Sequence, residues 1–524
     1  NGLVFRTGAD LSGDRLKSVS PAPAAVSLRT PNPIMFRTVL HYILTSLFLP
    51  SLIYAQTSLV LIEMKGVEEP ELNKALSLFG DQRGKAFASY LQQNALVVAT
   101  SAEARVLSER GLEFTVILED TSRSILFKRA LYGSAMKLSS FYHTYDQILG
   151  EADALIETHP DLITKFAIGK TTQEARTIYA IRISNDVAFR QDKPAILFDG
   201  CHHADEIMGA EICTALMNEL VTKYGSDPRI TDWVDSYEIL IVPVVNVDGH
   251  HVVTSGIDPR WRKNTHDTNG NGVLYEYPEG VDLNRNYDFN WAHGGSSDPM
   301  SVRYRGPHPF SEAENRAMRG LAEEYRFILS LTYHSQGEVV YYPWMWRGRK
   351  APEDKLLTEL ANGLGSSIRT MAGDTTYKAE YGAGTVGQSY PWLYGRYGTF
   401  DFVVETGKGA HIFPDSDAAR IIESNLEGIR YILDQGNGPG LTGHVTDAHT
   451  GKALGAQIWL PDIDMEDVER RTSLERTGRF WRLLSPGKHR LIVLKNGYEP
   501  GILPEVDVTA EGWTPVKITL RPIE

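Results

Sequence analysis

A histidine and a glutamate three residues apart, His203 and Glu206, stand where an apolar run gives way to a helical pattern. The run 195–198 predicts a buried strand, Gly200 a sharp exit from it, and residues 207–220 an amphipathic helix. An imidazole and a carboxylate one turn apart can bind a single metal ion, and these two ligand types suit zinc. Taken alone, the pattern is equally compatible with a surface histidine near a solvated glutamate.

Two later apolar runs end in further candidates for metal ligands or acid–base groups. Residues 329–333 are followed by His334, and residues 400–404 by Glu405. Ligands of open α/β sheets gather beyond the carboxyl ends of the strands, which is where both residues fall. We therefore expect His334 and Glu405 to face the first pair.

Two arginine motifs lie between the first two of these strands, Arg-Trp-Arg-Lys-Asn at 260–264 and Gly-Val-Asp-Leu-Asn-Arg-Asn at 280–286. Together the motifs run His-x-x-Glu, Trp-Arg-Lys, Asp-x-Asn-Arg-Asn, strand-borne His-Ser and strand-borne Glu. This order resembles the zinc metallocarboxypeptidases of the carboxypeptidase A-like group over roughly residues 139–437. Several long-range motifs in one order are more specific than any one of them.

The resemblance implies a role for each matching residue of the catalytic centre. His203, Glu206 and His334 would hold one zinc ion with a position left open, the ligand set known from carboxypeptidase A. Glu405 would take a proton from the attacking water and return it to the leaving amine. Arg262 would stabilise the oxyanion of the tetrahedral intermediate.

The same resemblance implies the substrate contacts. Arg285 would bind the terminal carboxylate of the substrate in a bidentate fork, with Asn284 adding a hydrogen bond, which would make the enzyme exo-acting. The family's capping tyrosine would fall at Ala383, and the nearest tyrosine is Tyr381. Tyr390 would line the pocket for the substrate side chain.

Two loops carry additional expectations. Asp205 stands where some family members carry arginine, and an acidic lining there would favour basic substrates. Asp267, Asn269 and Asn271 alternate like the start of a calcium loop, but its twelfth position is Pro278 instead of a bidentate glutamate. A turn rich in glycine and asparagine is the alternative to a calcium site.

The 524-residue chain is long enough for two or three domains, and its net charge of -13 argues against nucleic acid as a partner. The expected partners are the C-termini of peptides or proteins. The implied fold class is α/β, with a mixed eight-stranded sheet and helices on both faces at 139–437. A small α/β module at 56–138 would precede it, and a small antiparallel β-sandwich at 441–524, similar to a transthyretin-like domain, would follow.

The N-terminal part predicts export from the cell. Residues 1–34 lack periodicity and indicate a disordered or upstream segment, and 35–55 have the basic start, apolar core and small-residue end of a signal peptide. We expect a secreted or periplasmic protein beginning at Gln56, without a stable membrane span; a membrane anchor is the alternative. The module at 56–138 is loosely similar to activation domains, with Lys128-Arg129 as a candidate processing site, or is permanently attached.

Other functions remain open at this point. One is a zinc amidohydrolase or deacylase acting on small acyl-amino acids or cell-wall peptides, and another is a non-catalytic peptide-binding relative. The residues Arg262 and Glu405 argue against the latter, since binding alone needs no general base. Cys201 and Cys213, the only cysteines, are compatible with a disulfide or with two buried thiols.

Overall fold

The computed structural model divides into two compact units, Asn1–Thr121 and Ser122–Glu524. It describes residues 138–272, 274–275, 278–382, 386–465 and 468–523, together with four strands of the first unit. These strands form an antiparallel sheet in the order β2-β3-β1-β4. They are β1 (Leu59–Lys65), β2 (Ser89–Leu91), β3 (Asn94–Thr100) and β4 (Phe114–Glu119).

Several N-terminal expectations lie outside the described residues. They are the upstream segment 1–34, the signal peptide 35–55 and Lys128-Arg129. Three described strands of the first unit coincide with strands that the sequence predicts at 58–63, 95–99 and 114–118.

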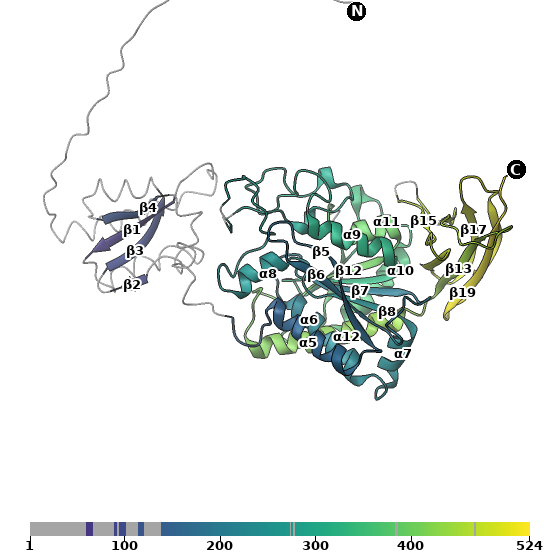
Figure 1. Ribbon diagram of the computed structural model, residues 1–524, viewed down its shortest axis with the longest axis horizontal. Coiled ribbons are helices and arrows are strands. Elements are labelled where there is room, and N and C mark those ends of the chain that lie inside the picture. Colours follow the sequence, from purple (N-terminus) through teal and green to yellow (C-terminus); the bar gives the residue numbers. More distant parts are fainter. Residues whose placement is uncertain are drawn as a thin grey trace, which may run out of the picture. The chain divides into compact units, whose positions relative to one another are not determined.

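The second unit is built on a mixed eight-stranded sheet, as expected (Figure 1). Its order is β11-β10-β12-β9-β7-β8-β6-β5, and the central strands β12, β9, β7 and β8 are parallel. The strands are β5 (Ile163–Lys170), β6 (Thr177–Ile183), β7 (Ala195–Gly200), β8 (Glu238–Val242), β9 (Leu329–His334), β10 (Val339–Tyr342), β11 (Lys378–Tyr381) and β12 (Phe400–Glu405).

Helices cover both faces of this sheet because alternate strand residues enter two apolar cores. Ile196 and Phe198 of β7 pack with α6, α10 and α12, whereas Leu197 packs with α9 and α11 on the other face. Figure 1 shows α6 and α12 below the sheet and α9 above it. The helices are α5 (Tyr145–Thr158), α6 (Met208–Lys223), α7 (Pro228–Ser236), α8 (Val247–Thr254), α9 (Ala313–Tyr325), α10 (Asp354–Ser367), α11 (Ser389–Tyr397) and α12 (Asp415–Gln435).

The carboxyl ends of β7, β9 and β12 meet at one edge of the sheet. In the strand register Gly200 is opposite Tyr333, and His334 is opposite Glu405. Glycine is required at the end of β7, since a Cβ on Gly200 would come within 2.7 Å of the carbonyl carbon of Gly209 in α6. This close approach of strand and helix fixes the loop that carries the first two candidate ligands.

The C-terminal part of the second unit is a sandwich of two sheets, β16-β13-β19 and β15-β14-β17-β18. Its pairs are antiparallel except β13 with β19, which run parallel. Leu441, Ile458 and Leu491 belong to its own apolar core. The strands are β13 (Gly440–Asp447), β14 (Gln457–Trp459), β15 (Arg471–Thr472), β16 (Arg479–Leu483), β17 (Gly487–Leu494), β18 (Gly501–Val508) and β19 (Trp513–Leu520).

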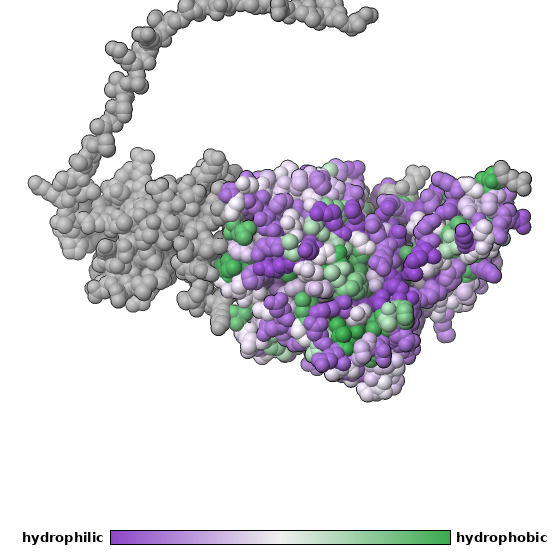
Figure 2. Space-filling model, in the orientation of Figure 1, coloured by the Kyte–Doolittle hydropathy of each residue, from purple (hydrophilic) through white to green (hydrophobic). Residues whose placement is uncertain are grey.

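The visible surface of the second unit mixes hydrophilic and hydrophobic residues, with the hydrophilic ones predominating (Figure 2). Among the described helices, none combines the length and the apolar character needed to cross a bilayer. Cys201 and Cys213 are both buried and free.

Candidate metal centre and substrate site

Three side chains from two strand ends converge as the sequence predicts. His203 and Glu206 come from the loop between β7 and α6, and His334 is the last residue of β9. The Nδ1 atoms of the two histidines lie 3.1 Å apart, and each lies within 2.8 Å of a Glu206 oxygen. All three residues are buried.

This donor set fits zinc in type and spacing. Two imidazoles and one carboxylate leave a fourth position open, as in catalytic zinc sites. Ligand atoms about 2.0–2.1 Å from a tetrahedral ion would lie roughly 3.3 Å from one another. The observed separations of 2.7–3.1 Å are slightly shorter, so small side-chain movements would accommodate the ion.

A carboxylate behind the cluster, Asp282, orients one of the candidate ligands. Its Oδ1 lies 3.1 Å from Nε2 of His203, the nitrogen on the far side of the ring from Glu206. Metal-binding histidines commonly use their second nitrogen in this way. Burial would raise the pKa of Asp282, but the positive charges of Arg262 and Arg285 hold it well below its usual value. Asp282 lies in the motif at 280–286, but the motif alone does not indicate this role.

Glu405 ends β12 beside His334, in the register that points both side chains to the same side of the sheet. Burial, and then the negative charge of Glu206, raise the pKa of Glu405 to about 8. A carboxyl group with such a pKa can both accept and release a proton near neutral pH.

Arg262 lies against the cluster. Its Nη1 donates to Oε1 of Glu206 at 3.1 Å, and its Nη2 donates to Oδ2 of Asp282 at 3.2 Å. The side chain is 26% exposed, so the guanidinium reaches the open side of the cluster. The carboxylates of Glu206 and Asp282 hold the Arg262 guanidinium in place. Its exposed side is available to an anion that forms during the reaction.

Arg285 is 6% exposed and pairs with no carboxylate in the described part of the chain. Its Nη1 donates to the backbone oxygen of the neighbouring Asn284 at 2.6 Å, and its Nε is buried without a partner. Burial lowers the pKa of this arginine. The charge of Asp282 favours the guanidinium form, but no described carboxylate forms an ion pair with Arg285 to offset its desolvation.

The amide of Asn284 is engaged within the protein. Its Oδ1 accepts the backbone N–H of Ser389 at 3.0 Å, and its Nδ2 lies 2.9 Å from Nε2 of His334. Asn284 thus connects the arginine loop to the metal cluster. These contacts fix the position of the Asn284 side chain. A hydrogen bond from Asn284 to the substrate stays a prediction.

The two expected tyrosines have other contacts. The hydroxyl of Tyr381 donates to Asp354 at 2.7 Å, and its ring packs 4.6 Å from that of Tyr342. The hydroxyl of Tyr390 donates to the backbone oxygen of Gly382 at 3.0 Å. Ala383, where the capping residue was expected, lies outside the described residues. The substrate roles of both tyrosines stay predictions.

Asp205 faces a histidine that the sequence analysis missed. Oδ2 of Asp205 lies 2.9 Å from Nδ1 of His411, and this hydrogen bond raises the pKa of the histidine. The ligand atoms of Asp205, Glu206 and His411 also lie within 4.8 Å of one another. The acidic lining expected from Asp205 is therefore partly neutralised by His411.

The loop expected as a calcium site folds as a turn. Both carboxylate oxygens of Asp267 accept backbone N–H groups, those of Gly270 and Gly272 each at 2.7 Å. The Oδ1 atom of Asn269 likewise accepts the N–H of Asn271 at 2.9 Å. These bonds support the alternative of a turn rich in glycine and asparagine and give calcium no support.

Comparison with known proteins agrees with this geometry. A zinc carboxypeptidase family model matches residues 148–428, and a carboxypeptidase regulatory-like domain matches residues 440–521. Carboxypeptidase B of Bos taurus is 28% identical over 347 residues, which cover 64% of this chain and 80% of that protein. Carboxypeptidase B of Rattus norvegicus is 32% identical over 307 residues, covering 56% of this chain and 70% of that protein.

Solved structures show the shared fold. Carboxypeptidase A from Helicoverpa armigera has 20% sequence identity and a TM-score of 0.51, covering 72% of this chain and 97% of its own. Bovine thrombin-activatable fibrinolysis inhibitor, solved with a tick carboxypeptidase inhibitor, has 24% identity and a TM-score of 0.50, covering 57% and 99%. Because residues 148–428 are more than half of the 524-residue chain, it belongs to the zinc carboxypeptidase family and is a zinc metallocarboxypeptidase.

Proposed function

We propose that this protein hydrolyses the C-terminal peptide bond of peptides or proteins and releases single amino acids. The observation that carries the proposal is the buried Arg285, which pairs with no carboxylate in the part of the chain that the structure describes. A free C-terminal carboxylate is an anion that a guanidinium binds through two parallel hydrogen bonds. An internal peptide bond offers no such group.

Residues around the cluster supply the chemistry. His203, Glu206 and His334 would hold zinc, which lowers the pKa of water and polarises a carbonyl group. Glu405 would act as a carboxylate and take a proton from the attacking water, because a zinc ion held by the cluster would favour its ionised form. Its raised pKa lets it keep this proton until the leaving amine accepts it. Arg262 stabilises the negative charge that develops on the scissile carbonyl oxygen.

Specificity would depend on residues near Arg285. Asn284 supports the carboxylate contact, Tyr390 lines the pocket for the C-terminal side chain, and Tyr381 contacts substrate from β11. The ion pair of Asp205 with His411 leaves little net charge for the selection of basic substrates.

A mass-spectrometric time course on a mixed peptide library tests the reaction. The protein from Gln56 onward is incubated with zinc, with a chelator, and with the chelator followed by zinc. We expect successive loss of single C-terminal residues that stops with the chelator and resumes with zinc. The residues lost first would reveal the side-chain preference.

Matched substrates separate the alternatives. Peptides amidated at the C-terminus should survive, because they offer Arg285 no carboxylate. Cleavage of N-acyl amino acids alone would favour a deacylase, and peptide binding without cleavage would favour a non-catalytic relative. Either result would overturn the carboxypeptidase assignment.

The N-terminal part completes the proposal. Residues 35–55 direct the chain to a secreted or periplasmic location, and the module at 56–138 precedes the catalytic domain 139–437 and the sandwich 441–524. Cell fractionation with N-terminal sequencing should find a chain beginning at Gln56. Comparing the activities of chains that begin at Gln56 and at Met136 tests whether the module inhibits the enzyme.

A further inference from the structure

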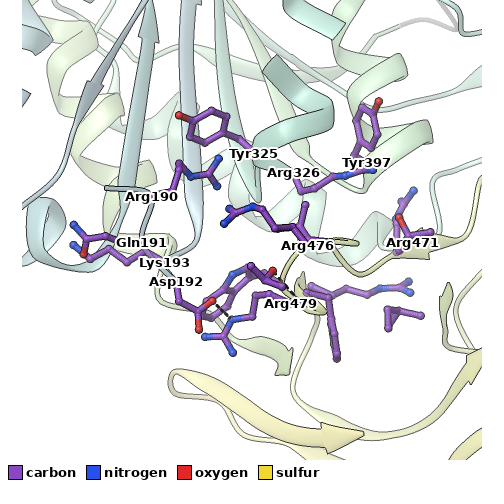
Figure 3. A pocket seen from close by; sticks show the side chains of 17 residues that line it. Arg190, Gln191, Asp192, Lys193, Tyr325, Arg326, Tyr397, Arg471, Arg476 and Arg479 are labelled. Carbon is purple, nitrogen blue, oxygen red and sulfur yellow. Dashed lines mark hydrogen bonds and ion pairs between the residues drawn. The ribbon is translucent and has the colours of Figure 1, made fainter. Parts of the chain in front are cut away.

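A strongly cationic pocket of about 150 Å³ lies where the C-terminal sandwich meets the domain of the eight-stranded sheet (Figure 3). Seven lysine and arginine side chains line it, and Asp192 is the one carboxylate among its lining residues. The pocket takes residues from the segment before β7, from the end of α9 and from β15 and β16. It is separate from the metal cluster and shares no residue with it.

Three of these cations have carboxylate partners and need no further anion. The pairs are Arg190 with Glu238 (2.7 Å), Arg482 with Glu353 (2.8 Å) and Arg479 with Asp192 (2.9 Å). These three arginines are explained by ion pairs within the protein.

Three other arginines, Arg326, Arg471 and Arg476, form no ion pair with any described residue. Arg326 lies over the ring of Tyr397, with its Cζ 4.4 Å from the ring centroid, and its Nε is buried without a partner. Arg471 is 6% exposed, but its Nη1 donates to the backbone oxygens of Gly395 at 3.2 Å and Glu469 at 3.3 Å, and the carboxylates of Glu353 and Asp464 favour its charge. Figure 3 shows Arg326 and Arg476 entering the pocket from different elements.

The protein backbone accommodates these arginines at some cost. Arg326 adopts a left-handed conformation, with φ of 51°, at the end of α9. Gly398, at the end of α11, has φ of 78°, and a Cβ there would overlap Nε of Arg471. Burial lowers the pKa of both arginines, but a guanidinium keeps its charge in proteins. Arg326 and Arg476 therefore bring positive charge to the pocket for which the described residues provide no ion pair.

We propose that this pocket binds an oxyanion of the phosphate or sulfate class, held by Arg326 from the catalytic domain and by Arg476 from the sandwich. Planar guanidinium forks match the oxygen geometry of such anions and bind them bidentately. A pocket of this size admits one phosphate or sulfate group, free or attached to a larger molecule. The bound anion connects the two domains, so its binding stabilises their association.

Isothermal titration calorimetry with inorganic phosphate and, separately, with sulfate tests the site. The titrations use the full second unit and the N-terminal module, from Gln56 onward, at constant ionic strength in chloride. We expect saturable binding of one anion per chain. In Arg326→Gln and Arg476→Gln the dissociation constant should rise by about tenfold or more, as expected for the loss of a charged hydrogen bond.

Arg490→Gln is the matched control, because Arg490 is exposed like Arg476 and lies outside the pocket. It should bind both anions like the unchanged protein. Retained peptidase activity and unfolding temperature show that each variant is folded. Phosphate and sulfate also stabilise proteins generally by exclusion from their surfaces, without a site. Equal titrations for all three variants, or no saturable heat in the unchanged protein, would overturn the proposal.

Discussion

Two arginines of similar burial, Arg285 and Arg482, have opposite environments. They are 6% and 5% exposed. Arg482 donates to Glu353 at 2.8 Å and to Asp464 at 3.0 Å, and these two charges raise its pKa despite its burial. Arg285 has no such partner in the described ion pairs, and burial lowers its pKa. Burial of charge alone therefore does not mark a functional site, whereas burial without a partner points to a missing ligand.

A similar contrast holds for two carboxyl groups, Asp464 beside Arg482 and Glu405 beside the metal cluster. Asp464 has its pKa lowered because hydrogen bonding to Arg482 outweighs burial. Glu405 has its pKa raised to about 8, since burial and the charge of Glu206 act in the same direction. The ion-paired cluster of Arg482, Glu353 and Asp464 holds the sandwich against α10. Glu405, by contrast, is available for proton transfer.

The largest effect is expected from Glu405→Gln. The amide cannot carry the proton, so turnover should fall by about 10²–10⁴-fold. Zinc content and unfolding temperature should stay unchanged, which steady-state kinetics with metal analysis and calorimetry can check. Activity close to that of the unchanged protein would place the general base elsewhere.

Arg482→Met should act on stability instead. It leaves Glu353 and Asp464 buried without their cation, a loss of about 3–5 kcal/mol. Denaturant unfolding measures this loss. At temperatures where the variant is folded, its kcat should equal that of the unchanged protein, because the cluster lies outside the metal site. A stable Arg482→Met protein would remove the distinction drawn between the two arginines.

Arg285→Gln should show the reverse pattern. Losing charged hydrogen bonds to the substrate carboxylate should lower kcat/KM by about a hundredfold. The free energy of unfolding should stay the same or increase, since a buried unpaired charge is removed. Peptides that end in a free carboxylate are compared with amidated peptides to check the cause. For amidated peptides, kcat/KM should be equally low in Arg285→Gln and in the unchanged protein.

The smallest effect concerns pH. Because the folded pKa of Asp464 is depressed, its contribution to stability is present above the usual pKa of about 3.9 and is lost as pH falls through the folded value. Asp464→Asn should flatten the dependence of unfolding free energy on pH below about 4. An unchanged slope in acid would show that Asp464 is not the titrating partner of Arg482.

Much of the fold and centre follows from local sequence patterns. Apolar residues predominate in the strands ending near His203, at His334 and at Glu405, so their carboxyl ends can be located without a structure. The apolar run 239–245 predicts a strand that extends beyond the observed end of β8. β8 ends at Val242 because Pro243, which follows, has no N–H to donate.

The residues that sequence analysis missed depend on distant partners. Asp282 is 79 positions from His203, and His411 is 206 positions from Asp205. Asp282 belongs to a quoted motif and His411 to none, but in both cases only the folded chain brings the residue to its partner. The short edge strands β10 and β11 were missed likewise, since four residues carry too little periodicity to distinguish a strand from a loop.

His334 and Glu405 are paired residues on the neighbouring strands β9 and β12. Catalysis therefore depends on the correct alignment of these two strands. A slip of one residue between β9 and β12 would turn one of these side chains to the other face of the sheet. Such a molecule would keep its helices and nearly all its apolar burial, and spectroscopy of secondary structure would scarcely distinguish it from the native one. Recovered enzymatic activity after refolding would therefore report strand alignment to a single residue.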